Sequence, residues 1–215
     1  DCLLSRGLGD VYKRQVRSEV ERFVFISSVK AGGSHEDDLG AKAEGVYGQT
    51  KRKAELIILE MGRQSKIHVS IVRPSLVYGP GVKGNLALMS TGIEQCWFPP
   101  IPETGNRRSL IHVDDLVQAM LFVAVHELAN GEIFIATDGL PHSSREIYAA
   151  ICHAVGKKVP KWSVPKYMFN TLSLLSPRIS YKVDKLFGDE YYSSKKLVNL
   201  GFMAKRTLKD WNNCE

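Results

Sequence analysis

The pattern of apolar and polar residues predicts a strand, a helix and a second strand between residues 21 and 72. Short apolar runs at 21–26 and 67–72 are typical of strands buried in a parallel sheet. Between them, from Tyr47 to about Arg63, apolar residues recur at helical spacing with lysines opposite. That apolar face comprises Ala54, Leu56, Ile57, Ile58 and Met61. Strand, helix and strand with short connections form the βαβ unit of a parallel sheet, so the sequence predicts an α/β fold.

The rest of the chain alternates between shorter helices and strands. Apolar runs predict strands at 109–111 and 132–136. The expected helices cover residues 85–93, 114–126, 143–155, 165–186 with an interruption near 176–177, and 193–200. Asp114 and Ser143 precede helices as candidate N-caps, and Gly201 follows one as a stop signal. Residues 97–106 are rich in proline and predict a loop.

Residues 73–81 separate the βαβ unit from the later helices and strands. This segment, Arg-Pro-Ser-Leu-Val-Tyr-Gly-Pro-Gly, holds two prolines and two glycines, which predict a break in regular structure. It comes directly after a predicted strand. Because open α/β sheets bind ligands at the carboxyl ends of their strands, we expect it to line a site.

Composition narrows the class of protein. The 215 residues are 44% hydrophobic, with a net charge of +6. No apolar run reaches the roughly 18 residues of a membrane span. The basic residues are scattered, so we expect acidic small ligands rather than nucleic acid. The four cysteines show neither metal-ligand nor disulfide spacing, so we expect no metal site and free thiols in a reducing, cytoplasmic compartment.

Tyr47 and Lys51 are candidate catalytic residues. Four residues apart, they share one face of the predicted helix. An ammonium near a phenol favours the phenolate and lowers the phenol pKa from about 10. Ser27 and Ser28 lie at the end of the first predicted strand, where a serine could hydrogen-bond the same substrate oxygen. Such a set could move a proton on and off an alcohol. On spacing alone, a half-buried tyrosine beside a solvated lysine is the commoner arrangement.

Four motifs in order resemble one family. They are Ser27-Ser28, Tyr47-x-x-x-Lys51, Arg73-Pro74-x-x-Val77-Tyr78-Gly79-Pro80-Gly81 and Arg108-x-x-Ile111-His112-Val113-Asp114-Asp115-Leu116. They resemble the extended short-chain dehydrogenase/reductases of the NAD-dependent epimerase/dehydratase group, which act on nucleotide sugars. Residues 81–85 are most similar to a branch of UDP-sugar 4-epimerase homologues that includes UDP-4-keto-sugar reductases.

The resemblance implies a role for each matching residue. Tyr47 would be the general acid/base, Lys51 would hold the nicotinamide ribose, and Ser28 would bind the sugar hydroxyl or keto oxygen. The cofactor would be NAD or NADP, and the resemblance implies that Ser27 and Pro74 also bind it, together with Tyr47 and Lys51. The substrate would be a UDP-sugar or related nucleotide sugar, and the resemblance implies that Asn85 and Arg108 also bind it. A guanidinium suits a diphosphate through forked hydrogen bonds.

The chain departs from the family pattern at Val46, where relatives often have proline, and in three further places. Ala31-Gly32-Gly33 stands where relatives often have Val-Tyr-Gly, and an Arg-Arg-x-Gly-Asp stretch typical of 4-epimerases is absent after Pro160. The glycine-rich loop that receives the dinucleotide pyrophosphate is also absent. We therefore expect an N-terminally truncated Rossmann-type sheet that binds NAD poorly by itself, and a branch other than the strict 4-epimerases.

The expected organisation has three parts. Residues 1–15 resemble a translated sequencing-adaptor tail and are expected to be a non-native leader. Residues 16–138 would be the C-terminal half of the NAD(P)-binding domain, with a substrate-binding insertion at 81–106, and residues 139–215 a small, mostly helical substrate-binding part. The expected protein is a nucleotide-sugar epimerase or 4-keto-reductase, and the parent enzyme a homodimer. Alternatives are a reductase of a non-sugar carbonyl and a non-catalytic binding protein of the same fold.

Overall fold

The computed structural model describes residues 20–32, 42–65, 67–174 and 176–212, and these divide between two compact units. The first unit is drawn from residues 1–76, 115–139 and 192–205, and the second from 77–114, 140–191 and 206–215. The expected leader, residues 1–15, lies outside the described part and stays a prediction.

The first unit is built on a parallel sheet. Strands β1 (Arg22–Ile26), β2 (His68–Pro74) and β5 (Ile133–Ala136) pair in the order β1-β2-β5. Both pairings are parallel, with Ile26 opposite Val72 and Pro74 opposite Ala136. The carboxyl ends of the strands therefore share one edge. The predicted βαβ unit and the α/β fold class are confirmed.

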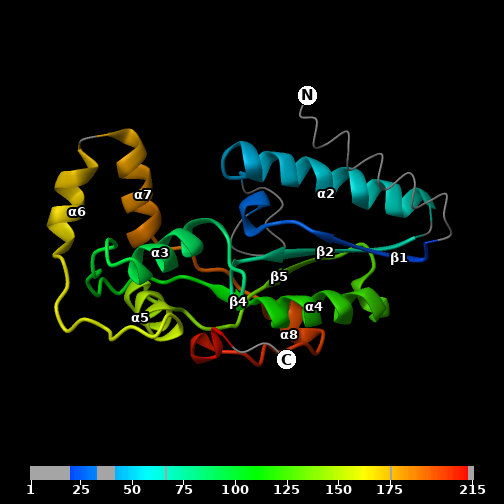
Figure 1. Ribbon diagram of the computed structural model, residues 1–215. Helices are drawn as coiled ribbons and strands as arrows, with labels where there is room; N and C mark the ends of the chain where they lie inside the picture. The colour runs from blue at the N-terminus through cyan, green and yellow to red at the C-terminus, as the bar shows by residue number, and fades with distance from the viewer. Residues whose placement is uncertain (1–19, 33–41, 66, 175, 213–215) are drawn as a thin grey trace. The chain divides into compact units, whose positions relative to one another are not determined.

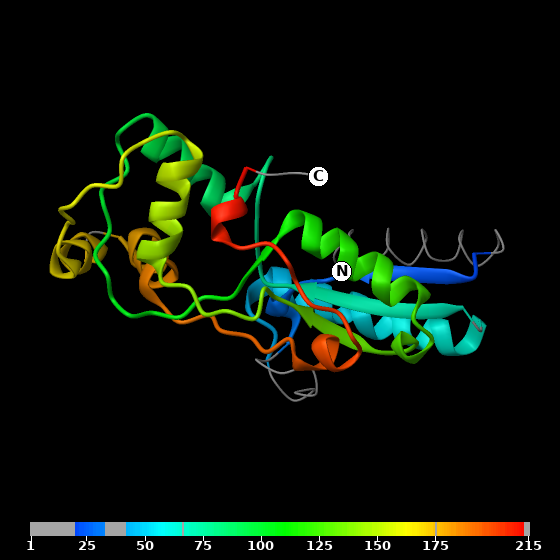
Figure 2. The same cartoon turned by 90° about the horizontal axis from the view of Figure 1, so that it is seen from below.

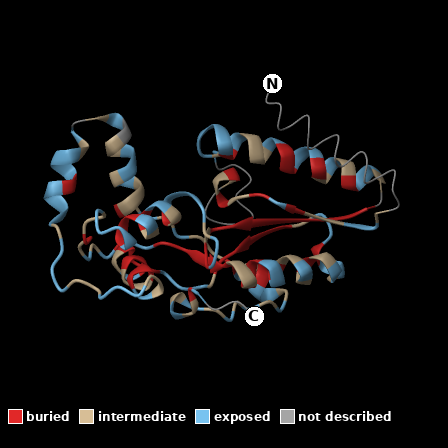
Figure 3. Cartoon of the chain, in the orientation of Figure 1, coloured by how far each residue is buried: buried red, intermediate tan, exposed pale blue. Residues whose placement is uncertain are grey.

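Helices cover both faces of this sheet (Figures 1 and 2). Helix α2 (Gly45–Ser65) lies on one face, and α4 (Val113–Val125) and α8 (Lys195–Asn199) lie on the other. Ala54 and Ile58 of α2 join Phe25, Val69 and Ile71 in one buried apolar cluster. Strands β2 and β5 are buried along their whole length (Figure 3). Burial of these side chains is what holds helix and sheet together.

The prediction of which α2 residues face the sheet is partly wrong. Leu56 and Ile57 are 55% and 41% exposed, whereas Ala54 and Ile58 are buried. Residues 54 and 58 are one helical turn apart and share a face, and Leu56 points about 200° away from Ala54 around the helix. The hydrophobic character of a residue did not by itself place it on the sheet.

The second unit is mostly helical. It contains α3 (Gly84–Glu94), α5 (Ser144–Ala154), α6 (Lys166–Ser173), α7 (Pro177–Phe187) and the 3-10 helix η3 (Leu208–Asp210). Helices α6 and α7 pack through Phe169 and Phe187, whose ring centroids lie 5.1 Å apart. As predicted, Ser143 caps α5: its side chain accepts from the Glu146 amide, and the Glu146 carboxylate accepts from the Ser143 amide. The predicted interruption near 176–177 separates α6 from α7.

Two local predictions are wrong. Within residues 73–81, expected to be irregular, Leu76–Tyr78 form strand β3, which pairs with β4 (Leu110–His112). Asp114 does not cap a helix but lies inside α4, which starts at Val113. Because β4 leads into α4 without a loop, His112 takes the capping position, and its Nδ1 accepts from the Asp114 amide at 3.2 Å.

The described part of the chain contains neither a membrane-spanning helix nor a cluster of metal-binding residues. None of its helices is both apolar enough and long enough to cross a membrane. It also contains no group of three or more histidines, cysteines or acidic residues that could hold a metal ion.

Candidate active site

Lys51 is held at the carboxyl edge of the parallel sheet. Its Nζ donates to the carbonyl oxygen of Ile26, the last residue of β1, at 3.0 Å. The same ammonium lies 5.0 Å from the ring centroid of Phe25 and 5.9 Å from that of Tyr47. Burial lowers the pKa of Lys51, and the carboxylate of Glu55 partly opposes that shift. Tyr47 is 59% exposed, so its ring is open to a ligand from solvent.

The start of α2 packs directly on the segment that carries Ser28. A Cβ on Gly48 would come within 2.1 Å of the Lys30 carbonyl oxygen, so only glycine fits at this position of the helix. The same carbonyl accepts from the Glu44 amide at 2.8 Å. Because Tyr47 precedes Gly48 and Ser28 lies two residues before Lys30, this contact brings the two candidate residues to one region.

The two serines play different structural parts. Ser28 is the N-cap of η1 (Val29–Ala31), and its Oγ accepts from the Lys30 amide at 3.3 Å. Ser27 extends the strand ladder, because its amide donates to the Val72 carbonyl at 2.8 Å. Its buried Oγ has no hydrogen-bond partner among the described residues. Pro74 is buried at the end of β2, on the same edge of the sheet.

A buried ion pair beneath these residues was missed from the sequence. Arg73 of β2 donates from Nε and Nη2 to the two carboxylate oxygens of Glu55 in α2, at 2.8 and 2.7 Å. Both side chains are fully buried. Glu55 follows Lys51 by one helical turn, so the pair fixes to the sheet the face of α2 that carries Lys51. A charged residue inside a fully buried strand was the available signal, since such a charge needs a partner.

Gly32 lies against this ion pair. A Cβ there would come within 2.2 Å of Arg73 Nη1, although the Gly32 backbone is extended and could accept other residues. At Gly32 the departure has a local reason: the guanidinium fills the space that a side chain at 32 would need. Residues 33–41 lie outside the described part.

The residues predicted to bind the substrate lie in the second unit. Asn85 is exposed in the first turn of α3. Arg108 is 8% exposed, and its Nη2 donates to Glu190 at 3.0 Å while its Nη1 donates to the Lys185 carbonyl. The predicted site residues thus form two groups: Ser27, Ser28, Tyr47, Lys51 and Pro74 in one unit, and Asn85 and Arg108 in the other.

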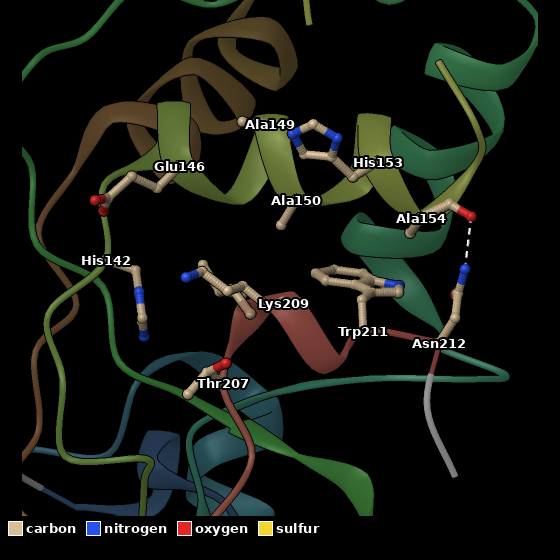
Figure 4. Close-up of a pocket in the computed structure, with 11 residues that line it drawn as sticks. His142, Glu146, Ala149, Ala150, His153, Ala154, Thr207, Lys209, Trp211 and Asn212 are labelled. Carbon is tan, nitrogen blue, oxygen red and sulfur yellow. Dashed lines mark hydrogen bonds between the residues drawn. The ribbon is translucent and has the colours of Figure 1, made fainter. Parts of the chain in front are cut away.

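The second unit also contains a cavity of about 640 Å³ (Figure 4). It opens between α5, which contributes Glu146 and His153, and the segment of η3, which contributes Thr207, Lys209 and Trp211. Asn212 closes one end through a hydrogen bond from its Nδ2 to the Ala154 carbonyl at 2.6 Å. None of the predicted site residues lines this cavity.

The sequence matches a known protein family. Residues 5–136 match the NAD dependent epimerase/dehydratase family. The chain therefore belongs to that family, and the predicted family is confirmed.

Several individual proteins of known name are similar to this chain. The chain is 33% identical to UDP-glucose 4-epimerase of Vibrio cholerae over 95% of its own length and 65% of that protein's. It is 27% identical to dihydroflavonol 4-reductase of Solanum lycopersicum over 77% of its length and 38% of that protein's. In fold it is similar to UDP-glucose 4-epimerase of Thermotoga maritima, with a TM-score of 0.67, 18% identity, and coverage of 93% of this chain and 63% of that one. The chain thus spans about two thirds of the epimerases it matches, and the predicted Rossmann-type fold is confirmed.

Proposed function

We propose that this chain carries the catalytic and substrate-binding residues of an NAD(P)-dependent enzyme that epimerises or reduces a UDP-sugar at C4. The observation that carries the proposal is the position of Lys51, whose ammonium is tied to the Ile26 carbonyl and lies near the exposed ring of Tyr47. In this proposal residues 16–138 belong to the cofactor-binding and catalytic part, with 81–106 as a substrate-binding insertion. Residues 139–215 complete the substrate-binding part.

The chemistry assigned to the first unit is proton transfer. Tyr47 acts as the general acid/base on the substrate hydroxyl, with the Lys51 ammonium 5.9 Å from the centroid of its ring. Ser28 holds the reacting oxygen: its bond with the Lys30 amide uses Oγ as an acceptor, which leaves the hydroxyl hydrogen to donate. The buried Arg73–Glu55 pair keeps α2 in place beneath them.

The same edge of the sheet suits the nicotinamide end of NAD or NADP. Ser27 offers a buried hydroxyl whose Oγ has no partner among the described residues, and Pro74 ends β2 beside it in the sheet. Lys51 retains further N–H donors for ribose hydroxyls after its bond to Ile26. When bound, the dinucleotide supplies the hydride chemistry at the sugar carbon.

The second unit would recognise the nucleotide-sugar diphosphate. Arg108 provides a guanidinium, and exposed Asn85 provides an amide in the first turn of α3. The identity of 33% with the Vibrio cholerae epimerase supports a UDP-sugar as the substrate. Identity with dihydroflavonol 4-reductase favours a second candidate, a reductase of an apolar carbonyl compound. Protection from thermal unfolding by UDP-sugars but not by apolar carbonyl compounds would separate the two.

The deciding experiment replaces Tyr47 by phenylalanine in the complete enzyme. We expect turnover of the UDP-sugar to fall by about 10²- to 10⁴-fold, because the general acid/base is lost, while UDP binding is retained. The matched control is Tyr167→Phe, which removes a hydroxyl from another exposed tyrosine. Unchanged turnover in the Tyr47 variant would refute the proton-transfer role.

The proposal includes a homodimer of the complete enzyme. Helix α2 exposes Val46, Leu56 and Ile57, an amount of apolar surface that is suited to a protein contact. Sedimentation equilibrium should report twice the monomer mass, and Leu56→Glu should shift it toward the monomer. A monomeric enzyme with full activity would contradict this part.

A further inference from the structure

One carboxylate in the second unit bridges two cations. Glu190 accepts from Arg108 Nη2 through Oε2 at 3.0 Å and from Lys185 Nζ through Oε1 at 2.7 Å. Lys185 belongs to α7, and Glu190 follows that helix by three residues. A site in which two cations share one anion is an anion-binding site whose present occupant is an internal side chain.

Arg108 uses only part of its donor set in this arrangement. In Arg73, Nε and Nη2 form one edge of the guanidinium and bond both oxygens of a single carboxylate. In Arg108 only one of the two donors on the corresponding edge forms a hydrogen bond. Nη2 donates to Glu190, but buried Nε has no hydrogen-bond partner among the described residues. The second oxygen of Glu190 is directed to Lys185 instead. A ligand with more oxygens could fill Nε and Nη2 of Arg108 and still reach Lys185.

The cations would stay in place if Glu190 moved away. Arg108 Nη1 donates to the Lys185 carbonyl, which anchors the guanidinium to α7 without any help from Glu190. The backbone of Arg108 is fixed by reciprocal hydrogen bonds with His142, both 2.9 Å. A preformed pair of cations is suited to bind an anion with little reorganisation.

Glu190 needs only a side-chain rotation to leave. Its amide donates to the Arg107 carbonyl, and its carbonyl accepts from the Ser109 amide, each at 2.9 Å. The backbone is therefore held on both sides. The side chains of Glu190 and Lys185 retain 21% and 19% of their exposure, so solvent and solutes reach the carboxylate.

We propose that Arg108 and Lys185 form a diphosphate-binding site, which Glu190 fills until the diphosphate of a nucleotide displaces it. The choice of a nucleotide diphosphate as the ligand rests on the function proposed above. Lys185 is then a substrate-binding residue that the sequence motifs did not include. Glu190 is an internal competitor that lowers affinity for the ligand.

The test measures binding of UDP, uridine and inorganic pyrophosphate to the whole chain by isothermal titration calorimetry. Glu190→Gln removes the competing charge, so UDP and pyrophosphate should bind about two- to fivefold more tightly, the equivalent of one part-exposed ion pair. Lys185→Gln should weaken both by a similar factor. Uridine lacks the diphosphate, so its affinity should not change in either variant.

A matched control removes the same charge elsewhere. Glu132 pairs with Lys196 at 2.6 Å in the first unit, and Glu132→Gln should leave all three affinities unchanged. Should Glu190→Gln fail to fold, the wild-type chain provides the test by NMR. The Nε–H signal of Arg108, assigned by its loss in Arg108→Lys, should shift when pyrophosphate is added.

The outcomes separate this inference from the proposed function. Unchanged or weaker UDP binding in folded Glu190→Gln, no binding of any phosphate probe, or an unmoved Arg108 signal would each overturn the inference. Binding that follows the expected pattern while the complete enzyme turns over no UDP-sugar would leave the inference standing and refute the proposed function. Turnover of a UDP-sugar with UDP binding unaffected by Glu190→Gln would do the reverse.

Discussion

The two units each contain an arginine paired with a glutamate, and the two pairs differ in burial. We call the fully buried pair closed and the part-exposed pair open. In the first unit, Arg73 and Glu55 are fully buried and joined by two parallel hydrogen bonds, while Arg73 Nη1 has no hydrogen-bond partner among the described residues. In the second unit, Arg108 shares Glu190 with Lys185, and about a fifth of the carboxylate side chain is exposed. The first pair connects a helix to a sheet, and the second connects a strand segment to the end of α7.

The difference separates a structural ion pair from one that can exchange. A fully buried pair cannot lose one partner without leaving an uncompensated charge in a low-dielectric interior. A part-exposed pair can lose its carboxylate to water or to another anion, because solvent screens the charges that remain. The surroundings of the two arginines, and not the chemistry of the side chains, make the first pair a fixed link between α2 and the sheet and leave the second exchangeable, as the proposed diphosphate site requires.

The largest expected effect is the loss of one partner from the closed pair. Arg73→Met should destabilise the protein by about 3 kcal/mol, because buried Glu55 would lose both hydrogen bonds from Arg73 and keep only Arg52, 3.6 Å away, as a counter-charge. Urea unfolding measures the change. The double variant Glu55→Met with Arg73→Met should recover most of the loss, since no unpaired charge remains. A cost below 1 kcal/mol for the single variant would show that water reaches the pair.

A smaller effect is expected from crowding the same pair. Gly32→Ala would place a Cβ within 2.2 Å of Arg73 Nη1 and should cost about 1–3 kcal/mol. The matched comparison is the same substitution in the Arg73→Met background, where the guanidinium is gone and most of the cost should disappear. If the two costs are equal in a double-mutant cycle, Gly32 is required for another reason.

The open pair should contribute less to stability than the closed one. Glu190→Gln should cost about 1 kcal/mol or less, because Arg108 keeps its bond to the Lys185 carbonyl and solvent screens Lys185. The cost should fall further at high salt. Unfolding in urea at low and high sodium chloride measures both. A loss as large as that of Arg73→Met would contradict the distinction between the pairs.

The smallest effect concerns an exposed carboxylate of the second unit. Burial alone would raise the pKa of Glu103, but hydrogen bonds from Ser143, Gly105 and Thr104, with the charge of Arg145, bring it below the ordinary 4.5. A lowered carboxyl pKa stabilises the fold above the unfolded value, and the contribution is lost as the pH falls through the folded value. Stability should therefore decline below about pH 4.5 less steeply in Glu103→Gln than in wild type. Parallel acid profiles would refute this role.

The sequence predicted those features that depend on neighbours along the chain. The βαβ unit was evident from runs of apolar residues, the cap of α5 from Ser143 and Glu146, and the Tyr47–Lys51 pair from helical spacing. The family resemblance added Asn85 and Arg108, which the structure assigns to the second unit. Local prediction failed at Leu76–Tyr78, because three residues between turn signals become a strand only by pairing with β4.

The ionic contacts could not be predicted in the same way. Arg73 and Glu55 are 18 residues apart, and Arg108 and Glu190 are 82 apart. No periodicity relates residues at those separations, and the chain has 29 basic and 23 acidic residues from which to pair. The sequence alone determined the fold class and predicted that Tyr47 and Lys51 share one helix face, because hydrophobic period and helical spacing are local properties. Only the tertiary structure decided which arginine pair is fully buried and which is part-exposed, because burial depends on segments that meet after folding.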